Sequence, residues 1–122
     1  MKTDKKAPPM QDYCLPRNGR RDLLFYGCLL GEGHANFDGC GTDVHIYRTV
    51  GGPYIVWTRR WSHQPYRSDK NAARIFSSLD VMHDWLRGDD DEWVGDMASW
   101  RAWRAAARRD SAIRAIEYTE IP

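Results

Sequence analysis

The sequence predicts an α+β fold, an antiparallel sheet of about four strands packed by two or three helices on one face. The first observation is a hairpin signal, because two runs rich in β-branched and aromatic residues flank Gly51-Gly52. The second is that an isolated hairpin is marginally stable in water, so this one needs further strands and a covering helix. The third is that helix signals follow the strand signals, from about Ser77 onward.

Length and composition indicate one domain with a core of its own. The chain has 122 residues, of which 42% are hydrophobic and 29% charged, and these values are close to the globular norm. Residues 1–20 are rich in lysine, arginine and proline and lack hydrophobic periodicity, so we expect a flexible basic tail there. Residues 21–122 are expected to form a single compact domain.

Four segments are predicted to be strands. The apolar run 23–30 fits a buried first strand, and the glycine-rich segment 31–41 that follows it is expected to be a loop. The two arms of the hairpin are expected at about 44–49 and 54–59, with alternating side chains on its two faces. A fourth strand is predicted at 72–76.

The first helix has the clearest local start signal. Ser77 is the expected N-cap, with Asp80 three residues later, and Phe76 and Val81 are spaced as in a hydrophobic staple. Gly88 is the expected C-terminal stop, because glycine readily adopts the left-handed conformation that ends helices. The side chains expected to face inward are those of Met82, Trp85 and Leu86.

The rest of the chain is predicted to contain a second helix and a returning strand. His83 is expected on the solvated side of the first helix. The acidic run 89–92 suits a second helix N-terminus, and Asp96 is another possible cap. Residues 97–109 predict an alanine-rich helix with tryptophans on one side and arginines on another. Residues 116–121 alternate and favour a strand.

Three short segments resemble a known family. Residues 27–33 read Gly-Cys-Leu-Leu-Gly-Glu-Gly, and residues 46–54 read Ile-Tyr-Arg-Thr-Val-Gly-Gly-Pro-Tyr. Both are similar to the strand and hairpin of the EXLDI family of small bacterial proteins. The Glu-Tyr-Thr-Glu-Ile at 117–121 matches that family's terminal motif only in part, with Thr for Leu and Glu for Asp. The resemblance covers roughly 23–121 and implies no activity.

Apolar runs and cysteine usage predict a cytoplasmic protein without a membrane partner. No apolar run approaches the length of a membrane helix, and no apolar stretch follows the N-terminal lysines. Three cysteines cannot all pair within one chain, so reduced thiols are expected.

The formal net charge is only +1, but basic and acidic residues are segregated into blocks that can pair with each other or face a partner.

Signals for catalysis or cofactor binding are weak. We find no nucleophile motif next to a base, so the protein is predicted not to be an enzyme and to need no cofactor. A small zinc-binding protein is one alternative, because four possible ligands fall within 18 residues, although without a Cys-x-x-Cys pair. Those four candidate ligands are Cys28, His34, Cys40 and His45.

Tryptophan and arginine carry the functional prediction, because these residues dominate the energetics of protein interfaces. We predict a non-enzymatic module that docks on a protein partner and blocks it, for example a phage or mobile-element inhibitor of host defence, similar in action to an anti-CRISPR. The alternative is a nucleic-acid-binding regulator that uses the same arginines. The predicted partner-binding residues are Arg59, Arg60, Trp61, Arg101, Trp103, Arg104 and Arg108.

Overall fold

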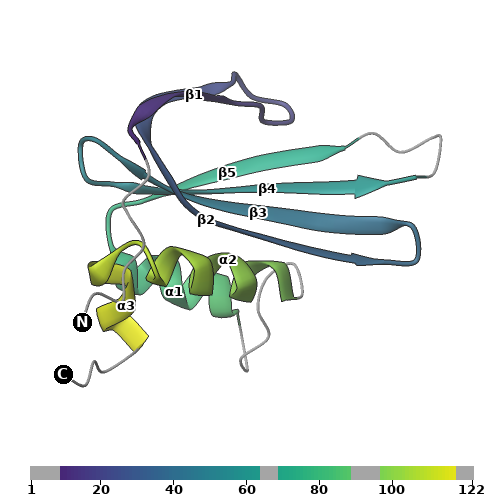
Figure 1. The fold of residues 1–122 in the computed structure, drawn as a ribbon. Helices are drawn as coiled ribbons and strands as arrows, with labels where there is room; N and C mark the ends of the chain where they lie inside the picture. Colours follow the sequence, from purple (N-terminus) through teal and green to yellow (C-terminus); the bar gives the residue numbers. More distant parts are fainter. Residues whose placement is uncertain (1–8, 64–68, 89–96, 118–122) are drawn as a thin grey trace.

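A computed structural model describes residues 9–63, 69–88 and 97–117, and in this part of the chain it has an α+β architecture (Figure 1). Five antiparallel strands form one curled sheet in the order β1-β2-β3-β4-β5, with three helices on one face. The predicted fold class is confirmed, with one strand more than expected. The elements are β1 (Gln11–Leu15), β2 (Leu23–Phe37), β3 (Cys40–Thr49), β4 (Tyr54–Ser62), β5 (Lys70–Phe76), α1 (Leu79–Arg87), α2 (Met97–Ala107) and α3 (Ser111–Glu117).

The predicted hairpin is confirmed as β3 and β4. Tyr47 pairs with Ile55 in its register, and the Thr49 amide donates to the Pro53 carbonyl at 2.9 Å at its end. Gly52 has φ +112°, which a side chain would disfavour. Glycine at this position is therefore what allows the tight connection.

The expectation of a tail through residue 20 is wrong for Gln11–Leu15, which form β1. This strand pairs antiparallel with the start of β2, with Leu15 opposite Leu23. Tyr13 and Leu15 alternate with exposed residues, so the strand places one apolar row on the sheet. Packing of that row orders β1, which itself contains neither lysine nor proline although both flank it in the sequence. Residues 1–8 lie outside the described part.

The glycine-rich segment 31–41 is also not the predicted loop, because β2 runs through Phe37 and β3 begins at Cys40. Its glycines let α2 lie directly on the sheet. A Cβ atom on Gly33 would lie 2.1 Å from the Ala98 carbonyl oxygen, and one on Gly31 would lie 2.4 Å from that of Ala102. The lack of a side chain at Gly31 and Gly33 therefore allows α2 to approach β2 closely.

The main core lies between the sheet and the helices. Alternate residues of β3 and β4 face this side, and the small alanines of α2 allow the helix to approach β2. Burying this apolar surface is the main driving force for folding. The residues completely or almost completely buried here include Val44, Ile46, Val56, Met82, Leu86, Ala98, Ala102, Trp103, Ala106 and Ile113.

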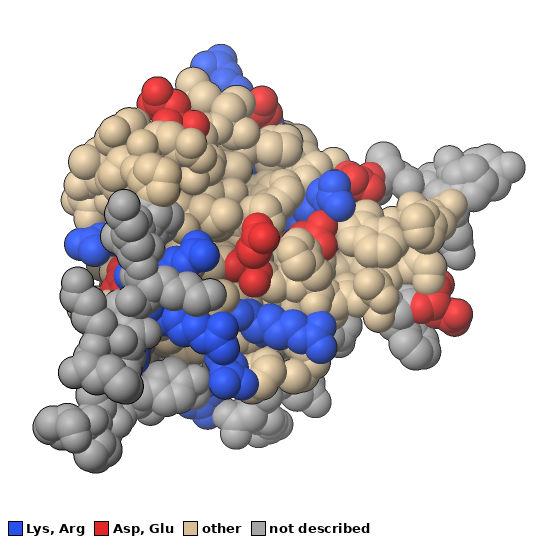
Figure 2. Space-filling view, in the orientation of Figure 1, with Lys and Arg blue, Asp and Glu red and all other residues tan. Residues whose placement is uncertain are grey.

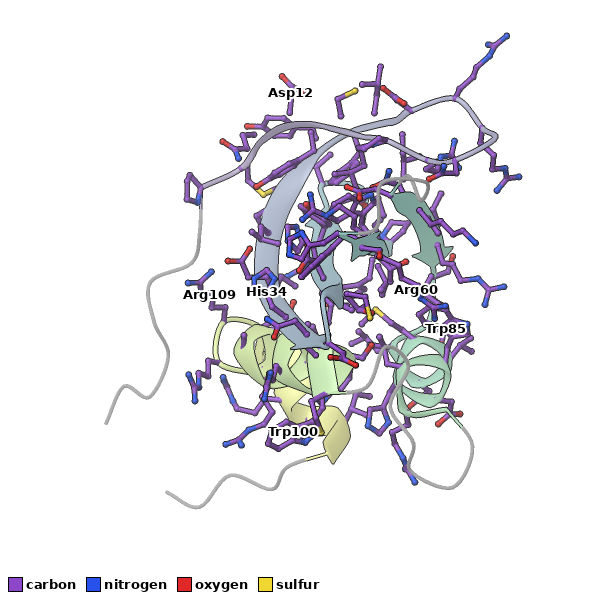
Figure 3. All side chains as sticks on the ribbon, turned by 90° about the vertical axis from the view of Figure 1, so that its right-hand side faces the viewer. Asp12, His34, Arg60, Trp85, Trp100 and Arg109 are labelled. Carbon is purple, nitrogen blue, oxygen red and sulfur yellow. The ribbon has the colours of Figure 1, made fainter. Side chains whose placement is uncertain are left out.

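A second apolar cluster occupies the opposite face, which we call the inner face because β1 and the first part of β2 curl over it (Figures 1 and 3). Tyr13 stacks on Phe25 with ring centroids 5.3 Å apart, and the Tyr47 ring meets both edge-on. The Trp57 indole donates to the Pro16 carbonyl at 3.0 Å. The cluster consists of Tyr13, Leu15, Leu23, Phe25, Leu29, Tyr47, Ile55, Trp57 and Ala73.

Helix α1 differs from its prediction at the start and agrees with it at the end. Ser78, not Ser77, is the N-cap, and its hydroxyl accepts from the Val81 amide. Val81 is 57% exposed, so it does not form the predicted staple with Phe76. Gly88 ends the helix as predicted, with φ 67°. None of the described helices is long and apolar enough to cross a membrane.

Two further predictions for the helical half are wrong. His83 is buried, with its ring 4.6 Å from that of Trp103, because it faces α2 and not solvent. Residues up to 117 form α3 where the start of a strand was expected. Buried Asp110 caps this helix, accepting from the amides of Ala112 and Ile113 at 2.9 and 3.1 Å. Residues 89–96 and 118–122, which include the predicted caps and strand end, lie outside the described part.

Candidate interaction surface

Helix α2 separates small residues from arginines. Ala98, Ala102 and Ala106 are buried against the rest of the fold, and this contact orients the helix. Arginines three and four positions apart are neighbours on one face of a helix. Their side chains are exposed because the alanines occupy the buried side of the helix. The exposed arginines on α2 and just after it are Arg101, Arg104, Arg108 and Arg109, which we call the arginine face.

Figure 2 shows lysine and arginine side chains gathered in a band over the helical layer. Two members of the arginine face are held in place. Arg104 lies over the Trp100 ring, 4.7 Å from its centroid, in a cation–π contact. Arg101 donates from Nη1 to the His34 carbonyl oxygen of β2 at 2.6 Å. This ordering lowers the conformational entropy that these long side chains would lose on binding.

Within the described ranges, none of these four arginines forms an ion pair. Arg108, Arg109 and Glu32 together line a small pocket of about 120 Å³ between α2 and β2. The face therefore offers more donors than neighbouring acids use. Arginine forks recognise carboxylate and phosphate groups with paired hydrogen bonds.

The seven predicted partner-binding residues do not form one surface. Arg101, Arg104 and Arg108 share the arginine face as expected. Arg59 and Arg60 are consecutive in β4, so they lie on opposite faces of the sheet. Trp61 is half-buried, with its ring 5.2 Å from that of His63. The set therefore divides between α2 and β4.

Trp103 is the clearest correction. Its exposure is 0%, so it belongs to the core and is not a surface anchor. Successive helix residues are about 100° apart, and the side that exposes Arg101 and Arg104 turns Trp103 inward. Trp100 is the tryptophan that supports the arginine face, through its contact with Arg104. The four-residue spacing between Trp100 and Arg104 is the sequence feature that could have predicted this contact. Arg109 was likewise missing from the predicted set.

Arg59 belongs to a polar network on the inner face, which we call the Asp43 network. Asp43 Oδ1 lies 2.7 Å from His34 Nδ1, and Asp43 Oδ2 accepts from Arg59 at 3.0 and 2.9 Å. Arg59 also reaches Asp69 at 3.7 Å. Partial burial raises the pKa of Asp43, but the contacts with His34 and Arg59 outweigh it and hold that pKa below 3.8.

His45 lies beside this network on the same face. Its Nδ1 is 3.1 Å from the Tyr47 hydroxyl, and its Nε2 is 3.5 Å from Glu32. Burial lowers the pKa of His45 below 6.5 in spite of the Glu32 charge, and burial raises the pKa of Tyr47. The ring of His45 is therefore neutral at pH 7. The arrangement therefore pairs His34 with Asp43 and His45 with Glu32.

The four zinc candidates are not brought together. Cys28 is buried on the helix side of the sheet, whereas His34 and His45 lie on the inner face with ring centroids 6.2 Å apart. Cys40 is exposed at the start of β3. Among the described residues, no group of three or more His, Cys, Asp or Glu side chains is placed to hold a metal.

Comparisons with models of protein families, with curated proteins and with solved structures give no match. The resemblance to the EXLDI family stays a prediction.

Proposed function

We propose that this protein is a non-enzymatic interaction module that docks through its arginine face onto an acidic surface of a partner protein in a cytoplasm. Docking would block that surface, and a phage or mobile-element inhibitor of host defence is the form of this function to test first. The observation that carries the proposal is the set of four exposed arginines without ion pairs to described acids.

A protein partner is favoured over nucleic acid by the size and setting of the face. A protein that neutralises about 6–10 phosphates of duplex DNA gains much of its affinity from them, whereas the arginine face has only four cations, two on α2 and two just after it. The net charge is +1, which gives little long-range attraction to a polyanion. The Trp100–Arg104 pair combines two residue types that are frequent in protein–protein hot spots.

The experiment is an affinity capture from host lysate, followed by calorimetry with the purified partner. The test variant is Arg101→Glu, Arg104→Glu. The matched control is Arg21→Glu, Lys70→Glu, which makes the same charge change at two exposed sites away from α2. We expect the control to bind like the wild type and the test variant to lose about 100-fold or more in affinity, because each reversed charge now repels the acidic partner.

Nuclease treatment and duplex DNA distinguish the rival function. A captured protein that survives nuclease and binds directly in calorimetry would support docking. Binding to random duplex DNA that weakens steeply with salt and is lost in the test variant would replace docking with nucleic-acid recognition. Equal loss in the test and control variants would contradict an interface on α2, because the effect would then follow net charge alone.

A further inference from the structure

The turn between β1 and β2 crosses the sheet and is fixed to the edge of β5. The Asn18 amide donates to the Asn71 carbonyl at 2.9 Å, and the Asn71 amide donates back to the Asn18 side chain. At the start of the turn, the Trp57 indole donates a hydrogen bond to the Pro16 carbonyl. These bonds place the turn against a strand that is distant in sequence, and they create a pocket beside β5.

This pocket has a volume of about 340 Å³ and is rich in positive charge. Arg17 and Arg20 come from the turn, Arg74 from β5 and Trp85 from α1. Figure 3 labels Trp85 where α1 approaches the foot of the sheet. No aspartate or glutamate is among the described residues that line the pocket. Three guanidinium groups thus share one concave site without a lining carboxylate to compensate them.

The two sides of the pocket have different chemistry. Arg74 lies 5.2 Å from the centroid of the Trp85 ring, and Trp85 is itself packed against Phe76 at 5.7 Å. This stacked pair presents flat, partly apolar surfaces. On the other side, Arg17 is positioned by donating from Nε to the Arg21 carbonyl at 2.9 Å, which leaves its terminal nitrogens for other acceptors.

We propose that this pocket binds a nucleoside phosphate, with the phosphate on Arg17 and Arg20 and the base against the Arg74–Trp85 pair. Arginine forks match phosphate oxygens, and bases stack well on guanidinium planes and aromatic rings. The volume lies at the lower end of the range for small-molecule sites, roughly 300–1,000 Å³. An inorganic ion would leave the flat side of such a pocket uncovered. The site is separate from the arginine face of α2.

The test is isothermal titration calorimetry of the full chain with ADP, with adenosine and inorganic phosphate as partial ligands. We expect ADP to bind in the micromolar to low millimolar range and each partial ligand to bind at least about tenfold more weakly, because each reaches only one side of the pocket. The variant Arg20→Gln, Arg74→Gln should weaken ADP binding by about 30-fold or more, since charge-assisted contacts to phosphate are strong. The variant Trp85→Leu removes the aromatic ring of the stacking side and leaves the arginines of the pocket in place.

Matched variants separate this site from the docking surface. Arg104→Gln, Arg108→Gln removes two members of the arginine face and should leave ADP binding unchanged, whereas it should weaken partner docking. Circular dichroism confirms that each variant is folded, and Arg20→Gln alone is the fallback because this residue is exposed. The absence of ADP binding at millimolar concentration, equal affinity for inorganic phosphate, or unchanged binding in both pocket variants would each overturn the proposal.

Discussion

Asp43 is the side chain that joins β2, β3 and β4 on the inner face. It accepts from His34 and Arg59 at 2.7–3.0 Å and is mostly buried. We expect Asp43→Asn to lower the free energy of unfolding at pH 7 by about 1–2 kcal/mol, less than a fully buried charged pair because Arg59 is partly exposed. Urea unfolding measures this difference.

The pH dependence of Asp43→Asn follows from the lowered pKa of Asp43. A carboxylate with a folded-state pKa below its ordinary value of 3.8 adds stability above that pH, and this contribution disappears as the pH falls through the folded pKa. The gap between wild type and Asp43→Asn should therefore close as the pH falls below 3.8 and through the folded-state pKa. Asp12→Asn, at an exposed site on β1, is the control and should change little at any pH. A gap that persists in strong acid would rule out this ionic role.

His45 should make the protein less stable in mild acid. Burial lowers its pKa, so the unfolded chain takes up the proton near the ordinary value of 6.5 while the folded protein resists it. The free energy of unfolding therefore decreases as the pH drops from about 6.5 to the folded-state pKa, and it recovers when the pH is raised again. His45→Gln should flatten that part of the stability profile, measured by thermal unfolding between pH 7 and 5. His63→Gln, at an exposed ring, should leave it in place.

Single side chains also show where sequence reasoning succeeds and fails. The outward arginines of α2 follow from helical spacing, and three of them were predicted correctly as one surface. Trp103 and His83 were misplaced because both are amphipathic residues whose burial depends on the neighbouring helix. The pocket of Arg17, Arg20 and Arg74 could not be predicted, since it depends on a turn that meets a strand 53 residues away.

Strand β2 and helix α2 form a contact that only glycine permits. We expect Gly33→Ala to lower the free energy of unfolding by about 2–4 kcal/mol, or to prevent folding, because its Cβ would lie 2.1 Å from the Ala98 carbonyl oxygen. Gly51→Ala is the matched control, with its nearest neighbour 3.8 Å away in the hairpin turn. It should be neutral or slightly stabilising, because alanine restricts the unfolded chain. Equal changes in the free energy of unfolding for Gly33→Ala and Gly51→Ala would contradict a close contact between α2 and β2 at Gly33.

This contact explains which elements the sequence predicts well. The hairpin of β3 and β4 carries local turn chemistry and alternation, so the strand ends beside its turn, Thr49 and Tyr54, were predicted correctly, whereas β3 begins four residues earlier and β4 ends three residues later than expected. The glycines of β2 look like loop residues until α2 is placed on them. Likewise, α3 depends on Asp110, whose buried carboxylate also accepts from the Tyr54 hydroxyl at 3.0 Å. Tertiary contacts decide these elements, and local pattern cannot reveal them.

The domain has apolar clusters on both faces of one sheet, and β3 and β4 contribute to both. Ile46 is buried against the helices, and Ile55 is buried on the inner face, with exposures of 0% and 2%. Because these strands connect the two clusters, loss of either should weaken the same cooperative unit. Ile46→Ala and Ile55→Ala should each lower the free energy of unfolding by about 2–5 kcal/mol. Each variant should still unfold in a single transition.

The measurement is urea unfolding followed in parallel by far-ultraviolet circular dichroism and tryptophan fluorescence. Coincident curves are expected for the wild type and both variants, because the tryptophans report on both faces: Trp103 on the helix side and Trp57 on the inner face. Val50→Ala, at an exposed position near the hairpin turn, should leave the midpoint nearly unchanged. If Ile55→Ala produced a separate early transition, the inner cluster would be an independent subdomain, and the curl of β1 over the sheet would not contribute to the stability of the helical layer.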